Sequence, residues 1–186
     1  MKTLITIFLT FLSLQTLAQQ SSLRGLVEIE PIVGYERVMK FEPTAHSKDR
    51  LTYGVRVRFG VPLLSLEAEA TQAKDTETFV DRDLTIKETS NTGMLGIRSS
   101  FRLGKIVSFY LRAGGHARQS EIERTEAGVT TTKKPAVYLS PYAGAGLGIN
   151  LNNRIRVNAG MTVVFTGRPR GSDREYRPTL GFSARF

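Results

Sequence analysis

The chain has 186 residues, enough for one domain, and 40% of them are hydrophobic. Beyond the N-terminus no apolar run reaches the roughly 20 residues that a membrane helix needs, so helical spans are excluded there. The formal net charge is +9 and the chain has no cysteine, which excludes disulfides and a lipid-modified cysteine. Because the basic residues alternate along the chain rather than forming one stripe, we expect no nucleic-acid partner.

The N-terminus has the features of a secretory signal peptide. Lys2 supplies a positive charge, residues 4–14 are almost wholly apolar, and Ala18 ends a short run that suits a cleavage site. We expect residues 1–18 to be the signal peptide and residues 19–186 to be the mature barrel domain described next. An N-terminal membrane anchor is the alternative, but the apolar segment is short for that role.

The rest of the chain alternates apolar and polar residues with the period of two that indicates β-strands. Eight strands are predicted, at residues 25–37, 51–60, 63–73, 86–102, 106–121, 136–150, 155–167 and 177–186. Three connections are tight turns, at residues 60–62, 103–105 and 151–154, and they contain the Gly, Pro and Asn residues that hairpins need. Four connections are longer and polar, at residues 38–50, 74–85, 122–135 and 168–176.

Short turns on one side and long loops on the other are typical of a transmembrane β-barrel. The predicted fold is therefore all-β: an eight-stranded antiparallel up-and-down transmembrane β-barrel, with both termini on the short-turn side. A soluble, lipocalin-like ligand binder in the periplasm also alternates, but its apolar face would point inward.

Aromatic residues on the apolar face favour the membrane arrangement, because such barrels carry aromatic girdles at both lipid–water interfaces. The predicted girdles contain Phe59, Phe101, Phe109 and Phe186 at the short-turn ends and Tyr35, Tyr53 and Phe165 at the long-loop ends. The soluble alternative gives these girdles no role.

The polar face carries charges of both signs, which we expect to form a network in the barrel interior. Its predicted members are Glu28, Glu30, Glu67, Glu69, Arg56, Arg58, Arg98, Arg112, Arg156 and Arg185. Opposite charges are needed there because an unpaired buried ion is very costly. Arg56 and Arg58 are expected to pair with Glu67 and Glu69 across a tight hairpin. Since an eight-stranded barrel has an interior only wide enough for side chains, a packed interior is favoured over an ion pathway.

The final residues, Gly181-Phe182-Ser183-Ala184-Arg185-Phe186, alternate up to a terminal aromatic residue. In this ending and in its strand pattern, the mature chain resembles the small outer-membrane barrels of the OmpA transmembrane-domain and OmpX type. The resemblance implies an outer-membrane location in a Gram-negative bacterium and recognition of the terminal Phe186 by the assembly machinery. It brings no functional motif, so it implies architecture and location rather than activity.

An alternative from another class is an outer-membrane hydrolase that modifies lipid A, as some small barrels do. His46 adjoins Ser47, but neighbouring side chains on an extended segment point apart, and Ser120 is four residues from His116. A nucleophilic serine needs a base within hydrogen-bond reach. We therefore expect no catalytic residues, and no cofactor or metal site either.

The last long loop is strongly basic, with Arg168, Arg170, Arg174 and Arg177 as a candidate site for an anionic partner such as lipopolysaccharide phosphate. A solvated loop, partly balanced by Asp173, is the alternative. The sequence thus predicts a monomeric or weakly oligomeric barrel with a structural or surface-interaction role. Its expected partners are outer-membrane lipid, lipopolysaccharide and the assembly machinery.

Overall fold

The computed structural model describes residues 26–40, 44–152, 154–166 and 174–186. The predicted signal peptide lies outside these residues. A single short 3-10 helix, η1 (Val80–Arg82), accompanies the strands of the described chain. The strands are β1 (Val27–Lys40), β2 (His46–Val61), β3 (Leu64–Phe79), β4 (Leu84–Leu103), β5 (Val107–Glu126), β6 (Val129–Lys133), β7 (Tyr138–Asn150), β8 (Ile155–Phe165) and β9 (Arg174–Arg185).

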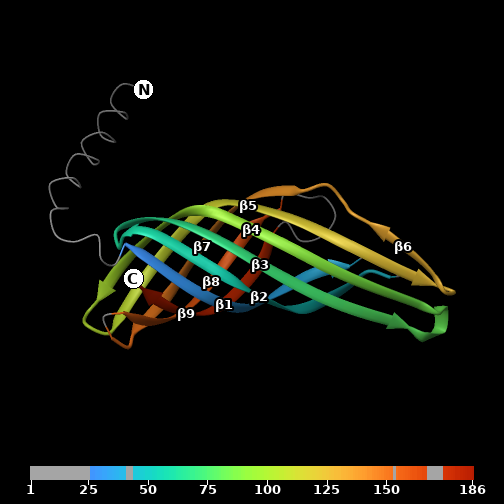
Figure 1. Cartoon of the computed structure of the whole chain (residues 1–186), viewed down its shortest axis with the longest axis horizontal. Coiled ribbons are helices and arrows are strands. Elements are labelled where there is room, and N and C mark those ends of the chain that lie inside the picture. Colours follow the sequence, from blue (N-terminus) through green and yellow to red (C-terminus); the bar gives the residue numbers. More distant parts are fainter. Residues whose placement is uncertain (1–25, 41–43, 153, 167–173) are drawn as a thin grey trace, which may run out of the picture.

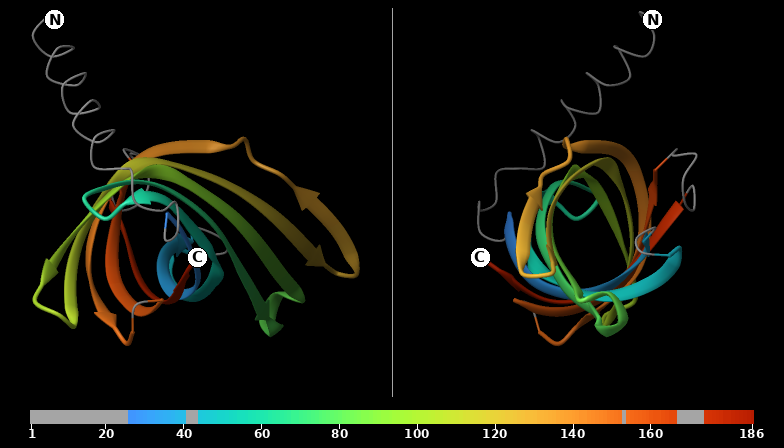
Figure 2. Two further views of the ribbon diagram at one scale, coloured as in Figure 1. Left: turned by 60° about the vertical axis from the view of Figure 1, so that its left-hand side comes forward. Right: turned by 90° about the vertical axis from the view of Figure 1, so that its right-hand side faces the viewer.

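The strands form one antiparallel sheet that closes into a barrel (Figures 1 and 2). The order is β4-β3-β2-β1-β9-β8-β7-β5, and the β4–β5 pairing completes the ring of eight. β6 lies outside this ring; within the described residues it pairs with β5 alone, beyond the point where β7 leaves that strand. The predicted eight-stranded up-and-down barrel is confirmed.

Both ends of the described barrel lie at the short turns, as the even number of ring strands requires. Glu28, near the start of β1, is directly opposite Arg185, near the end of β9. Gly60 and Gly104 have positive φ values, 126° and 94°, in the β2–β3 and β4–β5 turns. Glycine adopts this conformation without the steric cost that a side chain would add.

Three of the four predicted long loops are wrong in extent, because the strands continue through most of them. β2 begins at His46 rather than at residue 51, and β3 continues to Phe79. Between β5 and β6 only Ala127 and Gly128 separate the strands, both with positive φ, as expected for a two-residue hairpin turn. Residues 167–173 of the fourth predicted loop lie outside the described part.

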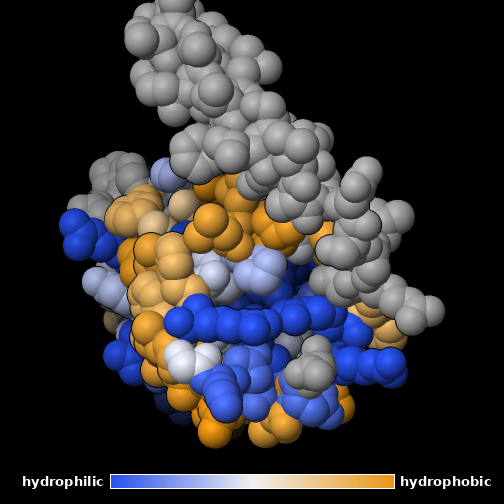
Figure 3. All heavy atoms as spheres, turned by 90° about the vertical axis from the view of Figure 1, so that its left-hand side faces the viewer, coloured by the Kyte–Doolittle hydropathy of each residue, from blue (hydrophilic) through white to orange (hydrophobic). Residues whose placement is uncertain are grey.

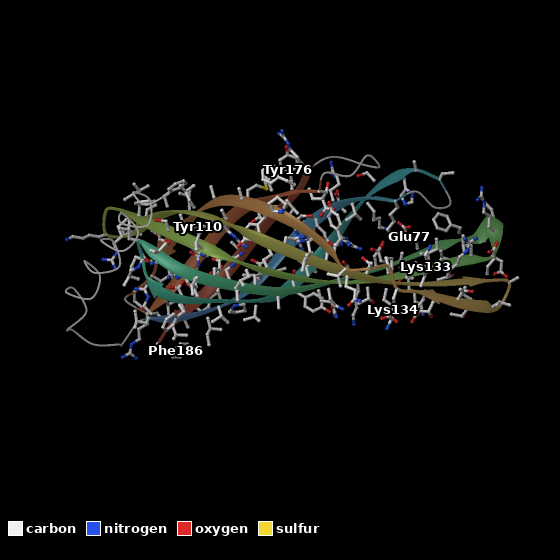
Figure 4. The ribbon with its side chains drawn as sticks, turned by 90° about the horizontal axis from the view of Figure 1, so that it is seen from above. Glu77, Tyr110, Lys133, Lys134, Tyr176 and Phe186 are labelled. Carbon is white, nitrogen blue, oxygen red and sulfur yellow. The ribbon has the colours of Figure 1, made fainter. Side chains whose placement is uncertain are left out.

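β3, β4 and β5 continue well beyond the ring, where they form a sheet with the short β6 (Figure 1). β4 and β5 each have 20 residues, whereas a tilted membrane strand needs only about 9–11. We call residues 74–90 and 119–133 the hairpin extension. In Figure 4, Glu77, Lys133 and Lys134 lie at the extension, and Tyr110 and Phe186 lie at the other half of the molecule.

The barrel has an inverted distribution of polar and apolar residues. Apolar side chains such as Val57, Leu95 and Leu180 are exposed on the outer surface, while charged ones such as Arg56, Arg98 and Glu67 are buried inside. Among the described residues, no helix has the length and apolar character needed to cross a bilayer. A charged interior is incompatible with the lipocalin-like alternative, which requires an apolar one.

Candidate functional site

The centre of the barrel contains a layer of ion pairs contributed by opposite walls. Arg56, on β2, contacts Glu69 of β3 at 2.8 Å and Glu30 of β1 at 2.8 Å. Arg112, on β5, reaches the same Glu69 at 2.9 Å and Glu67 at 3.0 Å. Since these residues belong to strands spread around the ring, their side chains connect the walls across the interior.

Aromatic rings and an amide complete this central layer. The Arg98 guanidinium lies 3.6 Å from the ring centroid of Tyr110, and that of Arg112 lies 4.9 Å from Tyr142. Asn158 of β8 donates to Glu30 Oε2 at 3.0 Å. Cation–π contacts of this kind are stronger where both groups are removed from water. The layer therefore acts as a polar core for the barrel.

Arg58 departs from the expected pairing. It is opposite Glu67 in the β2–β3 register, but its guanidinium contacts Glu28 of β1. Glu67 instead contacts Arg98 at 3.3 Å and Arg112 at 3.0 Å. The expected Arg58–Glu67 pair is therefore wrong. A side chain that faces the lumen lies close to several strands, so the backbone register alone does not determine which carboxylate Arg58 contacts.

A second layer, nearer the hairpin extension, is centred on Glu36 of β1. Glu36 is paired with Arg50, with Arg177 at 3.2 Å and with Arg118 at 3.6 Å. Arg177 is therefore a buried residue of β9 and not part of the last loop, which corrects its assignment to the anionic-partner site. Arg174 is exposed at the start of β9, while Arg168 and Arg170 lie outside the described residues.

The sequence interpretation missed this second layer, although the signal was present. Glu36 lies an even number of residues from Glu28 and Glu30 on β1 and therefore shares their face. Arg50 shares the face of Arg56 on β2 for the same reason. Glu36 already lies within the predicted strand 25–37, and extending the alternation of the next strand by one residue before 51 would have placed Arg50 in the interior as well.

A third cluster fastens the hairpin extension to β1 and β2, beyond the aromatic residues Tyr35 and Tyr53. Backbone pairing between β2 and β3 ends at Thr52 and Ala73. Beyond it, Glu77 of β3 contacts Lys40 at 3.3 Å, Lys48 at 3.2 Å and the His46 Nε2 at 3.1 Å. Side-chain ion pairs thus replace the backbone hydrogen bonds at this position.

The electrostatics of this cluster favour its charged form. A hydrogen bond from Nδ1 to the Thr44 carbonyl, together with Glu77, raises the pKa of His46 above its ordinary 6.5. Burial opposes ionisation of Glu77, but hydrogen bonds from His46 and Lys48 and the charge of Lys40 outweigh it and lower its pKa.

These shifts predict a pH window for the hairpin extension. The His46 contribution is complete below about pH 6.5 and is lost as pH rises through its higher folded pKa, while that of Glu77 is lost as pH falls below about 4.5. We expect amide exchange in residues 74–79, corrected for intrinsic rates, to be slowest between these values. In Glu77→Gln the pKa of His46, followed by NMR, should fall; an unchanged pKa would contradict the pairing.

The predicted girdle residues occupy the outer surface at both ends of the ring. Tyr35, Tyr53, Phe59, Phe101, Phe165 and Phe186 are exposed there, and Phe109 is half-buried between Phe101 and Leu147 of the neighbouring strands. Tyr176 joins the long-loop end, where the sequence interpretation had not placed it.

Neither histidine forms a hydrolytic pair with a serine in the described part of the chain. His46 contacts Thr44 and Glu77, and both ring nitrogens of His116 are buried without a hydrogen-bond partner. The Ser120 hydroxyl lies 3.3 Å from that of Ser90. Within the same residues, no group of three or more His, Cys, Asp or Glu is arranged to hold a metal ion.

The comparisons with known proteins agree with this architecture. The chain matches the family described as outer membrane protein beta-barrel domain over residues 4–186, and it belongs to that family. No curated protein matches the chain in sequence. The family match and the closed ring make it an integral outer-membrane β-barrel protein of a Gram-negative bacterium.

Solved structures with the same fold share little sequence with it. Ail of Yersinia pestis, in complex with the heparin analogue sucrose octasulfate, has a TM-score of 0.60 and 15% identity, covering 88% of this chain and 100% of Ail. Neisserial surface protein A has a TM-score of 0.57 and 11% identity, covering 86% and 96%. The N-terminal barrel of Pseudomonas aeruginosa OprF has a TM-score of 0.57 and 17% identity, covering 86% and 96%.

Proposed function

We propose that this barrel binds partners at the cell surface through the hairpin extension and the last long loop. The observation that carries the proposal is the length of β3, β4 and β5. These strands continue as a sheet far past Tyr35 and Tyr53, the aromatic residues at the long-loop end. All five residues of β6 are exposed, and in the described part of the chain its outer edge, opposite β5, pairs with no other strand. Such an edge can accept backbone hydrogen bonds from a partner.

We propose an anionic saccharide as the partner, with lipopolysaccharide phosphate as the nearest source. The last loop contains Arg168 and Arg170, Arg174 follows at the start of β9, and the extension presents exposed Lys87 and Lys133. Guanidinium groups pair well with phosphate and sulfate because their planar donors match the oxygen geometry. The heparin analogue bound by Ail, a barrel of the same fold, is consistent with this partner class.

The test is binding of purified lipopolysaccharide and of heparin to the detergent-solubilised barrel. Combining Arg168→Ala, Arg170→Ala and Arg174→Ala should weaken binding at least about tenfold, and added salt should weaken the wild type as well. Arg154→Ala, at the opposite end of the barrel, should bind like the wild type. Equal binding by the triple variant would show that the loop is only solvated.

We further propose that the role is non-catalytic and that the barrel is a monomer or weak oligomer. The histidine contacts described above support the first statement. The terminal strand, ending in Phe186, is proposed as the segment that the outer-membrane assembly machinery recognises. The signal peptide at residues 1–18 is proposed as the means of export.

A further inference from the structure

Positive charge is concentrated at the short-turn end of the lumen, which faces the periplasm in barrels of this kind. We call this end the periplasmic mouth and define it by Glu28, Arg58, Arg102, Arg156 and Arg185. Four of these five residues are cations. Figure 3 looks at this end and shows hydrophilic side chains across its centre, bordered by hydrophobic residues.

Glu28 is shared between two guanidinium groups. Arg58 and Arg185 both donate to its Oε2, the latter at 3.2 Å, and Arg58 also lies 3.4 Å from the Ser100 hydroxyl. Arg58 and Glu28 are almost fully buried. One carboxylate therefore balances only part of the charge that gathers around it.

Among the described residues no carboxylate forms a direct ion pair with Arg156, although Glu28 is near enough to attract it electrostatically. It is 5% exposed, and its Nε donates to the Asn150 side-chain oxygen at 2.7 Å. Gly148, opposite Asn158 on the neighbouring strand, leaves room for it: a Cβ at position 148 would lie 2.8 Å from Arg156 Cδ. Only Nε of this guanidinium donates a hydrogen bond within the described residues, and its terminal nitrogens are not sealed from solvent, so they can donate to a further group.

The balance of charge calls for an anion at this position. Arg58, Arg156 and Arg185 carry three positive charges, and Arg102 lies within electrostatic range of Arg156, whereas Glu28 supplies one negative charge. Burying a guanidinium without a counter-charge is costly, so a bound anion would stabilise the fold. Several guanidinium groups that converge from different strands form the arrangement that recognises phosphate.

We propose that the periplasmic mouth binds a phosphate group. The source is either inorganic phosphate or the headgroup of a phospholipid in the inner leaflet. This site is independent of the proposed saccharide surface, because it lies at the other end of the barrel and shares no residue with it.

The experiment uses the full barrel in a phosphate-free maltoside detergent. Inorganic phosphate is titrated by calorimetry, and the temperature of the folded-to-unfolded gel shift is recorded in phosphate and in chloride of equal ionic strength. Phosphate should raise this temperature for the wild type, because a ligand that binds only the folded state stabilises it. Arg156→Gln should bind phosphate about tenfold more weakly and lose the shift.

Arg154→Gln is the matched control, because it removes the same charge from an exposed turn at the same end. It should bind phosphate like the wild type. Glu28→Gln should bind phosphate more tightly, since it frees Arg58 and Arg185 from their carboxylate. This second variant tests the site even if Arg156→Gln folds poorly.

A lipid arm separates the two sources. The detergent-solubilised barrel is mixed with phosphatidylglycerol, and the lipid that it retains is counted by native mass spectrometry. Phosphate binding in the calorimeter identifies free phosphate, while retention of phosphatidylglycerol by the wild type but not by Arg156→Gln identifies a headgroup. If the wild type retains neither better than Arg156→Gln does, the proposal is wrong.

Discussion

Replacing Glu69 by alanine should lower the free energy of unfolding by about 3–5 kcal/mol, the largest effect that we expect from a single charge. Glu69 is the shared acceptor of Arg56 and Arg112, which contact it at 2.8 and 2.9 Å. Its removal leaves two buried guanidinium groups with only Glu30 and Glu67 as counter-charges. The lost attraction and the uncompensated burial act in the same direction.

The chain has no tryptophan, so unfolding is best followed by gel mobility of unheated samples across a urea series. Asp49→Ala is the control, because its pair with Arg37 lies on the exposed surface, where ion pairs contribute little. We expect its urea midpoint to equal that of the wild type. A Glu69→Ala midpoint equal to that of Asp49→Ala would show that the central layer does not hold the barrel together.

The second large effect is steric and can be reversed. A Cβ added at Gly160 would lie 2.1 Å from the Tyr110 hydroxyl oxygen, inside a lumen where Arg98 stacks on the same tyrosine ring. Gly160→Ala should therefore destabilise the barrel by about 1–3 kcal/mol. Adding Tyr110→Phe removes the clashing oxygen and should restore most of the loss.

The same urea series measures all four forms of this double-mutant cycle, namely the wild type, each single variant and the pair. Gly93→Ala is the matched control, since nothing lies within 4 Å of a Cβ at that outward-facing position. It should be at least as stable as the wild type, because alanine costs less backbone entropy than glycine. Additive effects of Gly160→Ala and Tyr110→Phe would argue against direct contact between these residues.

The ring of strands could be predicted because the membrane imposes a strict alternation. Where one face meets lipid and the other meets the lumen, apolar and polar residues alternate, as at Val57 and Arg58. In the hairpin extension the sequence Asp75-Thr76-Glu77-Thr78 is polar on both faces, so its strands were interpreted as a loop. Alternation carries no information where both faces of a sheet meet water.

The site was predictable in its composition but less so in its contacts. The alternation along each strand places Arg56 and Glu69 on the lumen face of neighbouring strands. Their direct contact then follows from the strand register. The partner of Arg58 depends instead on how side chains cross the lumen, which requires the closed ring. Arg177 was grouped with the basic loop because it was the first residue of the predicted strand, at the loop boundary, whereas β9 already begins at Arg174 and buries Arg177.

The most direct test of the whole account uses single cysteines, which are unique labels because the chain has none of its own. Fluorophores at Val57→Cys and at Thr78→Cys, in barrels reconstituted in bilayers, would be exposed to lipid-bound and water-soluble quenchers. We predict lipid quenching at position 57, on the outer face of the ring, and aqueous quenching at position 78, on the hairpin extension. Aqueous quenching at position 57, or lipid quenching at position 78, would contradict the inverted barrel with an extension that stands outside the membrane.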